Sequence, residues 1–183
     1  MFKTSMIALA LTVGIGSAAF AANPMVGGAE MFDNKTIVEN AMNSKDHTTL
    51  VSAVKAAGLG ETLMGKGPYT VFAPTNDAFS TLPAGAVDGL LKPEMKDQLG
   101  NVLKCHVVEG NAMAADIAKM TADGGGMTKI KTVGGCELTV KVDGDKVMIT
   151  DENGTTAHVT VADVKQSNGV VHVIDKVFMP KKG

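Results

Sequence analysis

The chain has 183 residues; all 17 of its basic residues are lysine, and with 19 acidic residues its formal charge is −2. Apolar residues make up 45% and aromatic residues 4%, a composition typical of a globular protein with one domain. A near-neutral chain without arginine lacks the dense basic contacts that nucleic acids and anionic membrane surfaces require, so we expect neither as a partner.

The N-terminus is typical of a secretory signal peptide. Lys3 precedes an apolar run over residues 6–20, and residues 19–21 (AFA) match a small-residue cleavage site. The run is too short and too rich in glycine for a comfortable membrane span. We therefore predict a signal peptide over residues 1–21 and a secreted or periplasmic protein that does not span a membrane. Residues 22–33 offer few groups to bury, and we expect this segment to be flexible.

The first half of the remaining chain is predicted to be mainly helical. Apolar residues at helical spacing indicate helices at residues 36–41 and 46–57. The β-branched and aromatic run at residues 69–72 (YTVF) predicts a strand buried on both faces, and a turn and short helix through Phe79 follow it. Pro93 suits the first position of a further helix.

The second half is predicted to be mainly β-structure. Four runs indicate strands at residues 129–133, 137–142, 146–150 and 155–161. An Asp-Gly turn joins the second run to the third, and an Asn-Gly turn joins the third to the fourth. Before these runs we expect a short strand at residues 106–108 and a helix at residues 112–120. After them we expect a final strand at residues 170–178. Helices followed by antiparallel hairpins predict the α+β class, not a wound parallel sheet.

The chain contains two cysteines, Cys105 and Cys136. In an oxidising compartment such a pair is most simply a disulfide, which here would close a loop of about 30 residues. Two buried free thiols, which behave as small hydrophobic side chains, are the alternative. Because the pair is not a C-x-x-C motif, we favour a structural bridge over a redox-active one.

Patterns for catalysis or tight metal binding are weak. Residues 60–66 (GETLMGK) match most of a phosphate-binding loop, but Gly67 stands where a magnesium-binding hydroxyl is needed. The chain has no G-x-S-x-G or H-E-x-x-H pattern, and its four histidines share no ligand spacing. Methionine clusters can bind copper(I), but the methionines here are scattered singly and suit gap filling in a core. We therefore expect no enzyme activity, no cofactor and no metal site.

Residues 70–79, 103–110 and 167–177 together resemble the fasciclin-like domain family. Residues 70–79 (TVFAPTNDAF) resemble its first signature block, and residues 167–177 (SNGVVHVIDKV) resemble its second. Between them, residues 103–110 (LKCHVVEG) resemble its central Tyr-His segment. The order and spacing of the three segments fit the family, and we expect a single fasciclin-like domain over residues 34–181.

The resemblance implies a compact α+β wedge, a β-sandwich with helices packed along one side. It also implies a non-catalytic module that mediates adhesion through a protein or glycan at a cell surface. Cys105 stands where the family usually carries the tyrosine of the Tyr-His pair, which is implicated in partner binding in animal members. That departure supports the disulfide. It leaves these candidate partner-binding residues: His106, Thr75, Asn76 and Asp77.

The signature blocks also have a structural interpretation, in which they hold the core together. Asn168 and Gly169 form a turn pair that tolerates positive φ. His172 shares a strand face with Ile174, so it needs a hydrogen bond if it is buried. The residues assigned to this structural role are Phe72, Pro74, Phe79, Asn168, Gly169, His172 and Asp175.

A carrier of a small apolar ligand, a lipid or a pigment, is the alternative function. Some fasciclin-like proteins resemble such carriers. A chain rich in methionine and poor in aromatic residues also suits an irregular apolar ligand, because methionine side chains adapt their shape.

Overall fold

The computed structural model describes residues 23–181, so the signal peptide predicted at residues 1–21 lies outside the described part. Helical elements are concentrated in the first half of the chain, as predicted. They are α1 (Ile37–Asn43), η1 (Lys45–His47), α2 (Thr48–Ala57), α3 (Gly60–Leu63), α4 (Asn76–Ser80), α5 (Ala86–Leu90), η2 (Pro93–Met95), α6 (Lys96–Lys104) and α7 (Ala114–Asp123). The strands are β1 (Met25–Val26), β2 (Ala29–Glu30), β3 (Tyr69–Pro74), β4 (Val107–Glu109), β5 (Met127–Lys131), β6 (Glu137–Asp143), β7 (Lys146–Thr150), β8 (Thr156–Gln166) and β9 (Gly169–Ile174).

Strands β3 to β9 form one seven-stranded sheet in the order β4-β3-β9-β8-β7-β6-β5. Every neighbouring pair is antiparallel except β3 and β9, which run parallel with Tyr69 opposite Gly169. The predicted antiparallel hairpins are present, and the parallel pair of β3 and β9 is an addition that the sequence pattern does not indicate. Its two strands are separated by every element from α4 to β8, so the chain returns beside β3 in the same direction.

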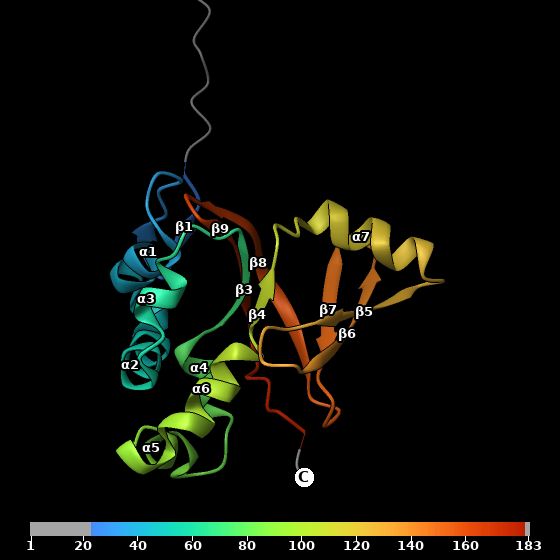
Figure 1. Ribbon diagram of the computed structural model, residues 1–183. Coiled ribbons are helices and arrows are strands. Elements are labelled where there is room, and N and C mark those ends of the chain that lie inside the picture. Colours follow the sequence, from blue (N-terminus) through green and yellow to red (C-terminus); the bar gives the residue numbers. More distant parts are fainter. Residues whose placement is uncertain (1–22, 182–183) are drawn as a thin grey trace, which may run out of the picture.

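Strand β8 bends the sheet into two facing halves. Its first residues pair with β7 and its later residues pair with β9, with register shifts on either side of Val161. Such bulges increase the local twist of a strand. Within this stretch Asp163 has a φ of 58°, in the left-handed region. The result is the predicted α+β wedge, with β4-β3-β9 facing β5-β6-β7 and helices α1 to α6 along one side (Figure 1).

The two faces of β3 bury their side chains in different cores. Val71 and Ala73 pack with Leu50 and other residues of the helices, whereas Phe72 packs with Leu138 between the two halves of the sheet. Strand β3 is thus buried on both faces, as predicted. In Figure 1 helices α1 to α6 lie on one side of β3 and β9, and β5 to β7 with α7 lie on the other.

The first residues of the described chain pack against the sheet, although we expected the segment over residues 22–33 to be flexible. Strands β1 and β2 form a short hairpin. Val26 and Met31 are buried against valines of β8 and β9. Only these two side chains of the described segment are buried, and glycines lie between them. The sequence therefore shows no apolar pattern here.

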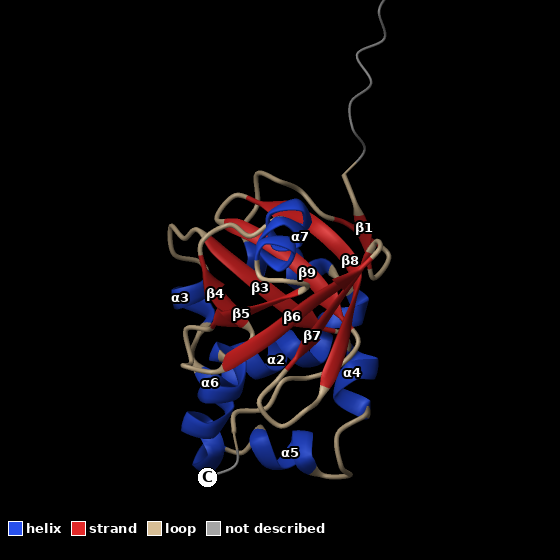
Figure 2. Ribbon diagram, turned by 90° about the vertical axis from the view of Figure 1, so that its right-hand side faces the viewer, coloured by secondary structure: helices blue, strands red, loops and turns tan. Residues whose placement is uncertain are grey.

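The outward face of β5, β6, β7 and the start of β8 carries no helix among the described elements (Figure 2). Its side chains alternate with those that enter the core between the sheet halves. One row across four strands consists of Lys129, Thr139, Thr150 and Thr156. The hydroxyls of Thr150 and Thr156 are hydrogen bonded at 2.9 Å. This polar sheet face is open to solvent.

Candidate functional site

The first signature block connects β3 to α4 and is mostly buried. Phe72 is fully buried, and its ring contacts those of His172 and Phe178, with centroids 5.8 and 6.2 Å away. Pro74 ends β3, and Phe79 is buried in the helical core. Phe72, Pro74 and Phe79 are therefore all buried.

Of the turn residues predicted to bind a partner, only Asp77 is exposed. Thr75 caps α4, since its Oγ1 accepts the Ala78 N–H at 3.3 Å. The Asn76 amide holds α4 to the region where α2 begins: its Oδ1 accepts the Thr49 N–H at 3.0 Å, and its Nδ2 donates to the Lys45 carbonyl at 2.8 Å. The turn therefore connects α4 to the start of α2, and the side chain that it exposes is the Asp77 carboxylate.

Asn168 in the second block joins the helices to the end of the sheet. Its Oδ1 accepts the Ile37 N–H at 3.1 Å, and its Nδ2 donates to the carbonyls of Leu63 and Gly65 at 2.7 and 2.9 Å. One buried side chain thus satisfies backbone groups at the start of α1 and around the end of α3.

Gly169 is required for a different reason from the one predicted. It does not have a positive φ. Instead, a Cβ atom at this position would collide with the carbonyl group of Tyr69 on the neighbouring strand. The residue is needed for close approach of the two parallel strands.

His172 is buried and has a partner on each ring nitrogen. Nε2 donates to the Ala112 carbonyl at 2.7 Å, and Nδ1 accepts the Asp163 N–H at 3.3 Å. Burial lowers the pKa of His172, and the contact with Ala112 opposes this only in part. The Asp163 carboxylate also accepts the Ala114 N–H at the start of α7. His172 and Asp163 together connect β9, β8 and the start of α7.

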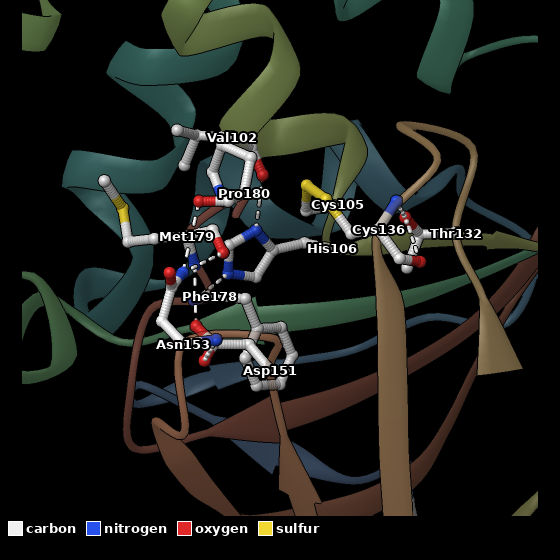
Figure 3. The surroundings of a disulfide bond; sticks show 10 residues. All are labelled: Val102, Cys105, His106, Thr132, Cys136, Asp151, Asn153, Phe178, Met179 and Pro180. Atoms are coloured by element: carbon white, nitrogen blue, oxygen red, sulfur yellow. Dashed lines mark hydrogen bonds between the residues drawn. A yellow bond between two sulfur atoms is a disulfide. The ribbon is translucent and has the colours of Figure 1, made fainter. Parts of the chain in front are cut away.

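His106 lies beside the disulfide between Cys105 and Cys136, which confirms the predicted bridge (Figure 3). The side chain is 2% exposed. Its Nδ1 donates to the Val102 carbonyl at 2.9 Å, and its Nε2 accepts the Phe178 N–H at 2.9 Å. Burial lowers the pKa of His106 to about 4. The expectation that His106 contacts a partner is therefore corrected: the ring is a neutral core group.

A buried carboxylate fixes the C-terminal segment next to His106. Asp151 accepts the N–H groups of Asn153 and Thr155 in its own turn and that of Met179 in the C-terminal segment. Figure 3 shows this network continuing through Phe178 to His106. The segment after β9 is thereby fastened to both α6 and the β7–β8 turn.

Asp175 lies at the surface beside His158. Its Oδ1 accepts the His158 backbone N–H at 2.7 Å, and its Oδ2 lies 3.2 Å from the His158 Nδ1. Both side chains are close to half exposed. The sequence singled out Asp175 but did not associate it with His158, which lies on the neighbouring strand β8.

An open groove lies between the two edge strands of the sheet, β4 and β5. The edges are closed at one end, where the Val133 N–H donates to the Val107 carbonyl at 2.8 Å and the disulfide lies nearby. The groove has a volume of about 400 Å³ and is lined by residues 108–112, by Asp116 and Met120 of α7, and by residues 129–131. No sequence signal indicated it, because the edges meet only when β8 bends the sheet.

Two small apolar cavities lie between the helices and the sheet. Their volumes are about 50 and 40 Å³, and Ile37, Leu50 and Val71 line both. His47 borders the smaller one; it is 3% exposed, and its Nε2 has no hydrogen-bond partner in the described part of the chain. Burial is the main cause that lowers the pKa of His47, and the nearby Ala73 backbone opposes it.

Within residues 23–181, no group of three or more His, Cys, Asp or Glu side chains is placed to hold a metal ion. Over the same residues, none of the helices combines the length and the apolar character needed to cross a membrane.

Comparisons with known proteins agree with this fold. The profile of the fasciclin domain matches residues 45–180. Protein sll1483 of Synechocystis sp. is 48% identical over 145 residues, which are 79% of this chain and 73% of that protein. Transforming growth factor-beta-induced protein ig-h3 of Sus scrofa is 35% identical over 79% of this chain but only 19% of its own length.

A solved structure of a domain pair from the insect cell adhesion molecule Fasciclin I has the same fold, with a TM-score of 0.70 at 17% identity. The match covers 78% of this chain and 50% of that one. The profile match and the relative from Synechocystis cover most of the chain. The protein therefore belongs to the fasciclin domain family.

Proposed function

We propose that this protein is a non-catalytic interaction module that acts outside the cytoplasm and mediates adhesion by binding a protein at a cell surface. Membership of the fasciclin family supports the proposal, as does the shared fold with a cell adhesion molecule. The signal-peptide pattern of residues 1–21 supports the location.

Two of the three buried histidines, His106 and His172, support a non-catalytic role. His106 and His172 each use both ring nitrogens for hydrogen bonds within the core. A general base must reach the substrate proton with a free nitrogen. Neither ring offers one, and burial favours the neutral form of both.

The groove between β4 and β5 is the observation that carries the proposal. Its walls are two strand edges, and an unpaired strand edge offers N–H and C=O groups to an added strand. Met120 provides an adaptable apolar contact, and it is 39% exposed. Acidic and basic residues line the groove together, Asp116 among the first and Lys131 among the second. An extended protein segment suits these features better than a glycan, because it can pair with the strand edges.

Binding to intact host cells tests this proposal. Fluorescently labelled Met120→Glu protein should bind at least tenfold less than the wild type, while Met64→Glu, at an exposed methionine outside the groove, should bind normally. Both variants should melt as the wild type does. Pretreatment of the cells with protease should abolish binding. Wild-type binding by Met120→Glu would contradict the groove, and loss of binding after periodate treatment alone would indicate a glycan.

The apolar cavities favour a carrier of a small apolar ligand as the second candidate. Their linings are almost wholly apolar, but cavities of about 50 and 40 Å³ are small beside the roughly 150 Å³ that admits benzene. A lipid or pigment would require α1 and α2 to move away from the sheet. A native mass spectrum of protein from its own host separates the two candidates, because a carrier would retain a discrete apolar compound. We expect the bare chain.

A further inference from the structure

The sheet register brings a methionine and a histidine together on the open outer face. Met148 of β7 and His158 of β8 are direct cross-strand partners. Directly opposed side chains point to the same face, with Cβ atoms about 4.5–5.5 Å apart. Ile149 and Ala157, the next opposed pair, are fully buried, so Met148 and His158 project away from the core. The two residues are ten positions apart in the sequence, and only the hairpin makes them neighbours.

Asp175 fixes the orientation of the histidine ring. It holds the His158 backbone N–H through Oδ1 and the His158 Nδ1 through Oδ2, at 2.7 and 3.2 Å. The Asp175 N–H in turn donates to the His158 carbonyl at 3.2 Å. With Nδ1 donating its proton to the carboxylate, the lone pair of Nε2 is left for another partner. Nε2 has no hydrogen bond within the described residues, and the side chain is 52% exposed.

We propose that Met148 and His158 bind one copper(I) ion, through the Met148 Sδ and the His158 Nε2. A thioether is a soft ligand that selects copper(I), and imidazole also suits copper. The carboxylate behind the ring is the outer partner that metal-bound histidines usually have, and it fixes the tautomer that exposes Nε2. This proposal stands independently of the proposed adhesive function.

The charges around the pair suit a monovalent ion. Lys141 lies opposite Met148 on its other side, and Asp175 contacts His158, so one charge of each sign lies beside the pair. A hard divalent ion would need several oxygen ligands. The Asp175 carboxylate already binds two groups of His158 and is not free to provide them. Binding here transfers no electron, and the ion is taken up and released as copper(I).

Anaerobic titration of the purified protein with copper(I) against a chromophoric competitor tests the site. We expect one ion per chain. Met148→Leu and His158→Gln should each weaken the affinity at least tenfold. Met64→Leu, the same substitution at an exposed methionine on a helix, should leave it unchanged. Asp175→Asn should weaken it by about tenfold, as loss of an outer partner does, while melting temperatures stay close to that of the wild type.

A spectroscopic measurement on the wild type avoids dependence on variants. With methyl-labelled methionine and silver(I) as an air-stable substitute for copper(I), the Met148 methyl signal and the His158 ring signals should shift together. Saturation at one equivalent of silver(I) would support the site. A shift at another methionine without Met148, or equal copper(I) affinity in wild type and Met148→Leu, would overturn the proposal.

Discussion

The helix-covered half of the sheet and the uncovered half use their polar side chains in opposite ways. In the covered half, Asn168 and His172 are buried and bond the backbone of distant elements. In the uncovered half, Thr150 and His158 lie on an exposed face and bond neighbouring strands. The most recognisable residues of the sequence therefore hold the fold together. The groove combines both kinds of residue, since residues 108–110 belong to the central segment whereas Met120 and Lys131 lie outside the three segments.

The disulfide connects these two regions, and its removal should have the largest effect on stability. The disulfide joins the end of α6 to the turn before β6 and closes a loop of 31 residues. Cys136→Ser should lower the free energy of unfolding by about 3–4 kcal/mol, because the unfolded chain regains the entropy of that loop. Urea unfolding under non-reducing conditions measures the change. Reduced wild type should fall to the level of the variant, and an unchanged midpoint would refute a stabilising bridge.

Asn168→Ala tests the claim that the signature residues are structural. The substitution leaves the Ile37 N–H and the carbonyls of Leu63 and Gly65 without their partner. Unsatisfied buried groups cost about 1–3 kcal/mol each, and partial access of water limits the total to about 3 kcal/mol. Asn111→Ala, at an exposed position, is the matched control. Equal unfolding midpoints for the two variants would contradict the structural role.

Much of the fold could be predicted from local patterns. The helices of the first half, the hairpins of the second and the doubly buried strand β3 follow from periodicity and turn residues. The parallel pair β3–β9 could not be predicted in this way, because it joins residues about 100 positions apart. The hairpin of β1 and β2 was missed because Val26 is the one side chain of these two strands that is buried, with Met31 just after them.

The candidate site was less predictable than the fold. His106 was a candidate for partner binding only through the family resemblance, and no local pattern indicated its burial. The C-terminal segment covers it through Phe178, whose N–H bonds its ring. The groove and the Met148–His158 pair depend on the bend of β8 and on strand register. Sequence spacing carries no information about either.

The buried histidines predict how stability depends on pH. The pKa of His106 is about 4 in the folded protein, against an ordinary value of 6.5. The unfolded chain therefore takes up a proton that the folded chain does not, so stability present above pH 6.5 is lost as the pH falls towards 4. Between pH 7 and pH 5 the loss from His106 is about 2 kcal/mol. His47 and His172, whose pKa values are also lowered, add to it.

Urea unfolding of wild type and His106→Gln at pH 7 and pH 5 measures this contribution. The variant is expected to be less stable at pH 7, because the ring packs against Phe178, but its pH dependence should be shallower by about 2 kcal/mol. The difference between the two pH values isolates the titration from the packing loss. Parallel pH profiles would contradict a buried neutral imidazole.

The smallest change in stability is expected from a substitution on the uncovered face, in contrast to the loss expected for Asn168→Ala. Lys129 and Glu137 form an ion pair at 2.6 Å, but their side chains are 67% and 50% exposed. Water and salt screen such a pair, and ordering two long side chains offsets the remaining attraction. Lys129→Gln should therefore leave the urea midpoint unchanged within error at low and at high salt. A loss of stability that disappears at high salt would show that this face contributes to the fold, and would remove the distinction between the two halves.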